Sequence, residues 1–331
     1  MRRTLTLLVA ATAFLAACSD DSSNTQSLVD NSAVITTAAP TSEVPTTAAT
    51  TTAPPDTTTA PTPKADPSRP YDVFVPTTYD ATTPMPLLLL LHGYSASGDI
   101  QEAYFQMQAL AEARGFLYVH PDGTVNPIGE QFWNATPACC GFNSKIDDSQ
   151  YLLDIITDVS NTYSVDPKRI YVMGHSNGGF MSYRMACDHA DVIAAVASLA
   201  GATFDDTAAC TPAEPVSVLQ VHGTADATIS YTGGEILGNA YPGAIDTAAK
   251  WAGYNGCTGG LGEADPTPAD FDQSVPGAET TEQFHEGCPT GVAVGVWTID
   301  GGSHIPPINT AAAPYPLTSA IVDFLLAHPK P

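Results

Sequence analysis

The chain has 331 residues, 44% of them hydrophobic, so it is long enough to form one large domain or two ordinary ones around a sizeable core. Its 35 acidic residues outnumber its 11 basic ones, and the formal net charge is −24. Such a surface repels nucleic acid and anionic lipid, which are bound by basic patches, so no nucleic-acid partner is expected. The same charge favours solubility and does not indicate a specific cationic partner.

Residues 1–18 are predicted to be a lipoprotein signal peptide. Arg2 and Arg3 precede the apolar stretch Leu5–Ala17, which is too short to span a bilayer as a mature helix. Small residues stand directly before Cys18, as in a bacterial lipobox, where the signal is cut before a cysteine that is then lipidated. An ordinary signal peptide that contains Cys18 by chance is the alternative. In both cases the mature protein works outside the cytoplasm, and with a lipobox it is anchored to the cell surface.

Residues 19–67 are predicted to be a disordered tether. Thr, Ala, Pro and Ser dominate this stretch, and it lacks the large apolar side chains that would offset the entropy lost on ordering. We expect it to hold the folded domain off the membrane. The lipid anchor is then expected to be the protein's only contact with the membrane. The folded domain is predicted to cover residues 68–331.

The folded part alternates between strand and helix patterns. Buried or alternating apolar runs predict strands, in chain order, at 71–76, 87–92, 116–120, 170–174, 193–199, 216–222 and 292–299. Helical spacing of apolar residues predicts helices over 100–114, 152–163, 178–187 and 317–326. Because strands and helices alternate, we expect an α/β fold in which helices cover both faces of a mostly parallel central sheet.

Six of the seven cysteines remain after Cys18 is set aside. An even count outside the cytoplasm fits up to three disulfide bridges, but the sequence alone leaves the pairing open. There is no C-x-x-C pair, so no metal site is expected. The six candidates are Cys139, Cys140, Cys187, Cys210, Cys257 and Cys288.

The stretch from Gly174 to Gly179 (GHSNGG) lies between a predicted strand and a predicted helix. Small residues around Ser176 permit a tight turn that presents its hydroxyl, and the helix N-terminus behind it favours developing negative charge. A G-x-S-x-G pattern alone is weak, and an inert serine in a glycine-rich turn is the alternative. The flanking strand and helix make the pattern specific, so Ser176 is the candidate nucleophile.

A serine hydroxyl needs a base and an orienting acid, in the chain order Ser, Asp or Glu, His. Asp226 follows the buried strand at 216–222, and His304 lies in a glycine-rich loop after the last strand. Both positions are at strand ends, where active sites of open α/β sheets gather. Asp300 is a competing acid, and His222 is expected to be structural. The histidines that lack such a setting are His285 and His328.

The oxyanion of acyl transfer needs two backbone N–H donors. We assign them to Asn177, the residue after the nucleophile, and to Tyr94, in the loop after strand 87–92. The Tyr94 ring is a candidate for the acyl pocket or, equally, a packed loop aromatic. Trp133 is a candidate for stacking on an aromatic acyl group or a sugar, and loop packing is its alternative. The Pro- and Gly-rich stretch 258–283 is a candidate loop near the site.

Several stretches together resemble the extracellular poly(3-hydroxybutyrate) depolymerase-like and feruloyl esterases, carbohydrate esterase family 1 in particular. They include LLLLLHGYSASG, FWNATPACCG, VDPKRIYVMGHSNGG, VHGTADATISY and WTIDGGSHIPP, and the resemblance covers residues 68–331. It implies an α/β-hydrolase fold, no metal or organic cofactor and hydrolysis through an acyl-enzyme, while the length of the folded part by itself suits a single catalytic domain. It implies Ser176 as nucleophile, Asp226 as acid and His304 as base.

The resemblance also implies that Cys257 pairs with Cys288. If it does, Cys139 and Cys140 are left to bridge to Cys187 and Cys210. The sequence departs from polymer-degrading members of the family in showing no separate binding domain, which argues against efficient attack on solid polymer. Ile305 follows His304 where relatives often have an aromatic residue, so the pocket wall is expected to differ.

The sequence therefore predicts a secreted, lipid-anchored serine carboxylic-ester hydrolase, monomeric, that acts on hydroxycinnamoyl or hydroxyalkanoate esters. The expected ester is a small molecule, an oligomer or an ester linked to polysaccharide. The alternatives are a hydrolase of aromatic or aliphatic synthetic polyesters, or a catalytically silent cell-surface binding lipoprotein.

Overall fold

A computed structural model describes residues 66–141, 144–308 and 316–331. The predicted signal peptide with Cys18, and the predicted tether up to residue 65, lie outside the described residues. Within the described part of the chain, no helix is long and apolar enough to cross a bilayer.

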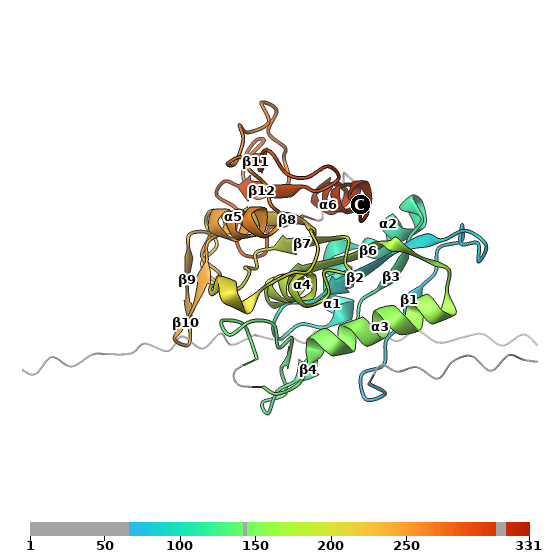
Figure 1. The fold of residues 1–331 in the computed structure, drawn as a ribbon. Helices are drawn as coiled ribbons and strands as arrows, with labels where there is room; N and C mark the ends of the chain where they lie inside the picture. Colours follow the sequence, from blue (N-terminus) through green and yellow to red (C-terminus); the bar gives the residue numbers. More distant parts are fainter. Residues whose placement is uncertain (1–65, 142–143, 309–315) are drawn as a thin grey trace, which may run out of the picture. The chain divides into compact units, whose positions relative to one another are not determined.

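The described residues form an eight-stranded central sheet with helices on both faces (Figure 1). The spatial order of its strands is β1-β3-β2-β6-β7-β8-β12-β11. The six inner strands pair in parallel, whereas β1 and β11 close the two edges in antiparallel fashion. The predicted α/β fold is confirmed. The strands are β1 Val73–Phe74, β2 Met85–Leu91, β3 Leu117–Val119, β6 Val165–His175, β7 Ala195–Leu199, β8 Ser217–Gly223, β11 Thr280–Phe284 and β12 Val294–Ile299.

The run Leu87–Leu91 illustrates why these strands are continuous apolar stretches. All five leucines are fully buried. Successive side chains of a strand point to opposite faces, so Leu87, Leu89 and Leu91 enter one apolar cluster while Leu88 and Leu90 enter the other. A strand with a core on each face has no polar side to alternate with.

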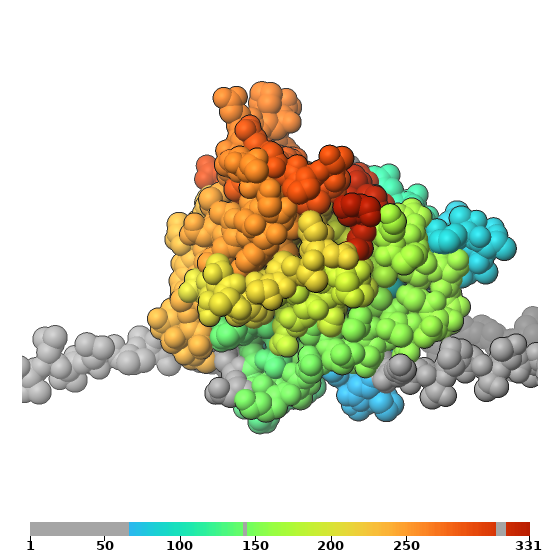
Figure 2. Space-filling model, in the orientation of Figure 1, coloured from blue at the N-terminus to red at the C-terminus, as the bar shows by residue number. Residues whose placement is uncertain are grey.

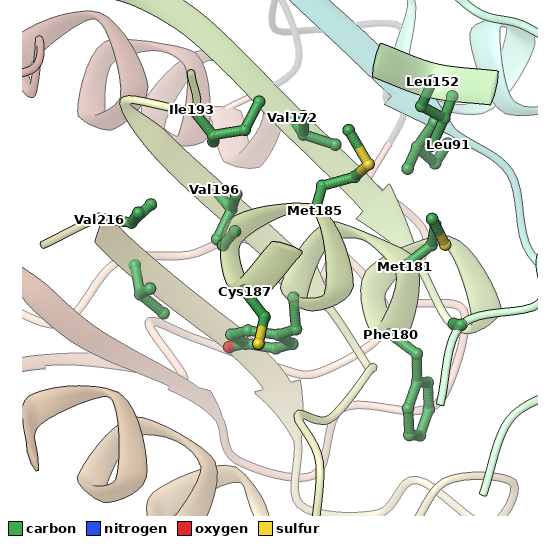
Figure 3. Packing of buried hydrophobic residues seen from close by; sticks show 14 of the residues in the cluster. Leu91, Leu152, Val172, Phe180, Met181, Met185, Cys187, Ile193, Val196 and Val216 are labelled. Carbon is green, nitrogen blue, oxygen red and sulfur yellow. The ribbon is translucent and has the colours of Figure 1, made fainter. Parts of the chain in front are cut away.

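Three helices cover each face. One cluster contains residues of α3 Asp148–Thr162, α4 Asn177–Asp188 and α5 Ala244–Tyr254, and Figure 3 shows α4 side chains such as Met181 and Met185 packed near strand residues Val172 and Val196. The other contains residues of α1 Gly98–Phe105, α2 Met107–Arg114 and α6 Pro316–Ala327. Because α4 starts directly after β6, its packing fixes the position of the turn between them.

Several elements differ from the prediction. The single helix expected over 100–114 is two helices, because Gln106 adopts a left-handed conformation between them. The expected strand at 71–76 is ladder-paired only at Val73–Phe74. Elements not predicted are α5, β11, a 3-10 turn at Thr207–Ala209, and two ribbons, β4 Thr124–Val125 with β5 Gln131–Phe132 and β9 Gly233–Ile236 with β10 Asn239–Pro242.

The segment between α5 and β11 projects as the orange extension at the top of the domain in Figures 1 and 2. Its backbone reaches the loop that follows His304, since the N–H of Gln273 donates to the carbonyl of Pro307 at 3.4 Å. The stretch 258–283 therefore touches the loop that carries a candidate site residue.

The six cysteines of the folded part form three disulfides. Cys257 and Cys288 pair as the family resemblance implies. The expected bridges from Cys139 and Cys140 to Cys187 and Cys210 are wrong, because Cys139 bonds to its neighbour Cys140, and Cys187 bonds to Cys210. Cys187 lies near the end of α4 and Cys210 just after the 3-10 turn, with Cα atoms 5.5 Å apart, within reach of a disulfide. Three disulfides suit an oxidising compartment outside the cytoplasm.

Candidate active site

Ser176 stands at a sharp turn between the end of β6 and the start of α4. Its backbone angles, φ 53° and ψ −120°, are rarely adopted by a residue with a side chain. The turn also requires glycine on both sides. A Cβ at position 174 would collide with the carbonyl of Gly178, and a Cβ at position 178 would collide with that of Leu91. The glycines of the motif thus allow β6, α4 and β2 to meet closely behind the serine.

A line of two hydrogen bonds joins the three side chains that the sequence singled out. The Nε2 atom of His304 lies 2.9 Å from the Oγ atom of Ser176. On the other side of the ring, Nδ1 lies 2.7 Å from Oδ2 of Asp226. A carboxylate can only accept, so Nδ1–H donates to it and Nε2 is left to accept the serine proton. Ser176 and Asp226 are largely buried, with 9% and 7% of their surface exposed.

The competing acid Asp300 is directed elsewhere. It is exposed, and its Oδ1 atom accepts a hydrogen bond from the hydroxyl of Thr224 at 3.0 Å. The Nδ1 atom of His328 pairs with the carbonyl of Phe324 on α6. Among the predicted acid and base candidates, the structure brings only Asp226 and His304 to the serine.

The Asp226 carboxylate is held by four donors. Oδ1 accepts the backbone N–H groups of Thr228 and Ile229, at 2.8 and 2.9 Å. Oδ2 accepts from His304 and, at 3.2 Å, from the Nε2 atom of His222. Burial acts to raise the pKa of Asp226, but the hydrogen bonds from His222 and His304 outweigh it and hold the pKa well below its usual value. The group stays ionised beside the imidazole.

Two further histidines support the site, although the sequence predicts a role in it for neither. His222 was expected to be structural, yet it bonds directly to Asp226. His175, the residue before the serine, uses Nε2 to donate to the carbonyl of His304 at 2.8 Å, and their rings lie 4.9 Å apart. The available signal was position: His222 is four residues before the acid on the same strand end, and His175 adjoins the nucleophile.

Asn177 carries the predicted first oxyanion donor, its backbone N–H at the start of α4. Its side-chain amide pairs with the backbone of Trp133, accepting from its N–H at 2.7 Å and donating to its carbonyl at 2.9 Å. These two hydrogen bonds connect the loop after β5 to the residue after the nucleophile.

Trp133 does not contact solvent. Its exposed fraction is 0%, its indole N–H donates to the carbonyl of His92 at 3.0 Å, and its ring packs 5.0 Å from the His92 ring. The prediction that Trp133 stacks on substrate is therefore wrong, because the ring is fully buried and packs on His92. Loop packing, its alternative, describes the residue.

Tyr94 lies at the edge of a cavity whose lining residues do not include Ser176, Asp226 or His304. It follows Gly93, where a Cβ would be 3.4 Å from the Cβ of Ser176, and its ring is 36% exposed with its hydroxyl accepting from Asn126 at 2.9 Å. The adjoining cavity has a volume of about 630 Å³ and mostly apolar walls. Its walls are formed by Tyr94, Thr124, Val125, Asn126, Pro127, Ile128, Phe132, Gly141, Ser144 and Ile146.

The residues near the serine do not offer a metal site. Among the described residues, no group of three or more His, Cys, Asp or Glu side chains is placed to hold a metal ion. The polar groups around Ser176 are instead arranged in a hydrogen-bonded line from Ser176 through His304 to Asp226.

Comparison with known proteins points to the same chemistry. The model of the prolyl oligopeptidase family matches residues 102–213, a segment that includes Ser176 and ends before Asp226. Feruloyl esterase B of Piromyces equi is 35% identical over 240 residues, which cover 69% of this chain and 41% of that protein. The chain thus spans less than half the length of this relative.

Two further relatives are matched over more of their own length. A putative esterase, NocK, of Nocardia uniformis is 27% identical over 72% of this chain and 69% of its own length. Feruloyl esterase D of Neurospora crassa is 28% identical over 72% of this chain and 74% of its own length. The sheet order and the turn at Ser176 are those of an α/β-hydrolase fold, and in sequence the chain is similar to feruloyl esterases and to an esterase.

Proposed function

We propose that the protein hydrolyses carboxylic esters through an acyl-enzyme, with Ser176 as nucleophile, His304 as general base and Asp226 as the acid that orients it. The observation that carries the proposal is the hydrogen-bonded line from Ser176 Oγ through the His304 ring to Asp226 Oδ2, at 2.9 and 2.7 Å. Its donors and acceptors already point in the direction that proton transfer requires.

In the first half-reaction, Ser176 Oγ attacks the carbonyl carbon of the ester while its proton passes to Nε2 of His304. The tetrahedral intermediate collapses, the bond to the alcohol oxygen breaks, and that oxygen leaves with the proton from Nε2. Water then repeats the sequence on the acyl-enzyme and releases the acid. Asp226 remains a carboxylate throughout and stabilises the imidazolium that forms next to it.

The negative oxygen of the tetrahedral intermediate needs donors on the side of the turn away from His304. We assign them to the backbone N–H groups of Asn177 and Tyr94. Asn177 supplies the end of the α4 dipole as well, and its side-chain bonds to Trp133 hold that N–H in a constant place. Tyr94 follows Gly93, the residue packed against Ser176.

The substrate class is an ester whose acyl part is an aromatic, hydroxycinnamoyl-type group. Two of the relatives are named feruloyl esterases. The apolar cavity beside Tyr94 has the volume and the walls for a flat aromatic group, with Phe132 and the Tyr94 ring among them. A 3-hydroxybutyrate ester, which lacks an aromatic ring, gains less from such walls.

We propose that the protein is a monomer on the outer cell surface, anchored by a lipid on Cys18. The tether of residues 19–67 separates the catalytic domain from that anchor. The lipobox-like sequence and the Thr- and Pro-rich composition support it. Recovery of wild type and a Cys18→Ser variant in the same aqueous phase after detergent partitioning would contradict the anchor, and light scattering tests the monomer.

The function is tested by product release from methyl ferulate and from 3-hydroxybutyrate oligomers, side by side. Ser176→Ala is expected to lower turnover of the preferred ester by about 10³-fold or more, as loss of a nucleophile does. Ser319→Ala, on the helix α6, is the matched control and should keep wild-type turnover. Faster release from 3-hydroxybutyrate would refute the aromatic acyl pocket but not the mechanism.

A fluorophosphonate probe separates an enzyme from a silent binding protein, because the probe reacts only with an activated serine. We expect labelling of the wild type and of Ser319→Ala, and none of Ser176→Ala. Absence of labelling in the wild type would refute the proposed hydrolase and favour the cell-surface binding protein.

A further inference from the structure

The hydrogen-bonded line at the active site does not end at Asp226. His222, at the end of β8, bonds to Asp226 Oδ2 at 3.2 Å through Nε2. Its other ring nitrogen, Nδ1, lies 3.1 Å from Nε2 of Gln220, and the Oε1 atom of Gln220 lies 2.5 Å from the hydroxyl of Tyr183 on α4. The contacts form an unbroken path from the core to the nucleophile.

The neighbouring carbonyl groups assign a direction to each bond in this path. The carbonyl of Ile229, 2.8 Å from His222 Nε2, can only accept, so the proton of His222 is on Nε2. Nδ1 is then an acceptor and must receive its bond from the Gln220 amide. That amide nitrogen also donates to the carbonyl of Gly201 at 2.9 Å, so its oxygen faces Tyr183. Burial holds the pKa of Tyr183 well above its usual value, so its hydroxyl remains a donor.

The path runs through a part of the core that excludes water. Tyr183 and Gln220 are 0% exposed and His222 is 1% exposed. A buried polar group that loses its partner destabilises the fold, so each of these side chains depends on the next one along the path. Apolar residues could fill the same space without needing hydrogen-bond partners. The presence of polar side chains here therefore suggests that they serve a function beyond packing.

The path also joins the two elements that carry the reacting groups. Tyr183 lies on α4, the helix that begins just after Ser176, seven residues further along the chain and hence on nearly the same helix face. Gln220 and His222 are two residues apart on one face of β8, the strand that leads into Asp226. A hydrogen-bonded bridge therefore spans from the nucleophile's helix to the acid's strand.

We propose that His222, Gln220 and Tyr183 are positioning residues for Asp226, which, given the proposed triad, keep its Oδ2 atom aimed at His304. Gln220 fixes the tautomer of His222, and His222 in turn fixes the carboxylate by donating to the oxygen that His304 uses. Backbone donors hold only the opposite oxygen, Oδ1, so without His222 the carboxylate can pivot about that side. Such a pivot would misplace the base without changing the substrate pocket.

The test compares kcat and KM for His222→Leu, which removes the donor, with His222→Gln, whose amide can place a nitrogen near the same point. We expect His222→Leu to lower kcat about 10–100-fold with KM unchanged, the range seen when groups that orient a ligand or base are lost. His222→Gln should restore most of kcat. Tyr183→Phe keeps the packed ring and should give a smaller loss, also in kcat.

Asn255→Ala is the matched control for loss of a buried, hydrogen-bonded side chain. Asn255 is 2% exposed and bonds the backbone of Val216 at 3.0 and 2.7 Å, without contact to Asp226. It should lower the free energy of unfolding but leave kcat intact. If Asn255→Ala loses as much kcat as His222→Leu, or if the His222→Leu loss appears in KM, the positioning role is overturned.

The fluorophosphonate probe keeps the two proposals apart. An unlabelled wild type refutes the proposed function, whereas a labelled and active wild type with an equally active His222→Leu refutes only the positioning role. If His222→Leu does not fold, Tyr183→Phe decides the question. A Tyr183→Phe variant with wild-type kcat and wild-type kcat/KM would refute the positioning role of these residues.

Discussion

Burial lowers the pKa of His175 to about 4, from an ordinary value of 6.5, because the ring lies out of water beside His304. The ring is neutral at pH 7 and donates through Nε2 to the His304 carbonyl. A proton added to Nδ1 would place a charge in the core next to the ring of the proposed base. Protonation of His175, the residue before the nucleophile, would therefore affect the loop that carries His304.

The free energy of unfolding should fall as the pH drops from 6.5 to 4. The unfolded chain takes up a proton on His175 near pH 6.5 and the native state only near pH 4, so in this window the unfolded state binds more protons. Acidification then costs up to about 3 kcal/mol from this one group. Urea unfolding of wild type and His175→Gln at pH 7, 5.5 and 4.5 measures it. An equally steep decline in the variant would contradict the assignment to His175.

Some site residues could be predicted singly and others only as part of the folded structure. Ser176, Asp226 and His304 each follow a strand in a short, recognisable motif, so their chain order was enough to nominate them. The position of His222 four residues before Asp226 was a usable signal, but the bond itself depends on the loop through Ile229 folding back over the strand end. The burial of Trp133 likewise depends on the ribbon β4–β5, which pairs residues that have no clear strand pattern.

At the scale of elements, the break between α1 and α2 is stabilised by a side chain of α1 that caps the start of α2. The Glu102 carboxylate accepts the backbone N–H groups of Met107 and Gln108, both at 3.1 Å, and so caps α2 from within α1. Gln106 takes up the turn with φ 52°. The apolar spacing over 100–114 continues through the break, and glutamine favours helices, so the sequence predicts one helix.

Gln106→Gly should raise the free energy of unfolding by about 1 kcal/mol, because the left-handed conformation costs an L-residue that much and glycine nothing. Gly115→Ala, at the left-handed end of α2 with φ 73°, should lower it by a similar amount. A Cβ there would approach nothing closer than Thr78 Oγ1 at 3.7 Å, so the loss comes from the backbone alone. Denaturant titration measures both, and a shift of the two variants in the same direction would contradict this account.

The missed elements have different causes. β11 is a short edge strand of largely polar sequence, TTEQF, that pairs with β12 in the sheet and lacks a continuous apolar run. In contrast, α5 has a readable signal, since Ala244, Ala248 and Ala252 recur every four residues on its buried face. Central strands were predicted well because both of their faces are covered, which makes their sequences distinctive.

At the scale of the whole molecule, the three disulfides differ in how much of the chain they constrain. Cys257–Cys288 and Cys187–Cys210 close segments with sequence separations of 31 and 23, whereas Cys139–Cys140 joins neighbours. Only the first two restrict the unfolded chain over a long stretch. The adjacent pair escaped prediction because a bridge between neighbours leaves no trace in cysteine count or spacing.

Replacing both Cys257 and Cys288 by serine should lower the free energy of unfolding by about 3–4 kcal/mol, the loop-entropy value for that length of chain. Replacing Cys139 and Cys140 together should cost much less, because no long loop is released. Guanidinium unfolding of the two double variants under oxidising conditions compares them. An equal loss in both would contradict the loop-entropy account.

The ribbon β4–β5 forms its own two-stranded sheet, separate from the central sheet whose strand ends present Ser176, Asp226 and His304. Its exposed side chains Val125 and Ile128 help to form the cavity beside Tyr94. If this cavity holds the acyl group as proposed, the residues that select the ester and those that cleave it lie largely in different stretches of the gene, with Tyr94 shared between the two tasks. A library randomised only over residues 125–130 is then expected to change the preferred ester while Ser176, Asp226 and His304 are inherited unchanged.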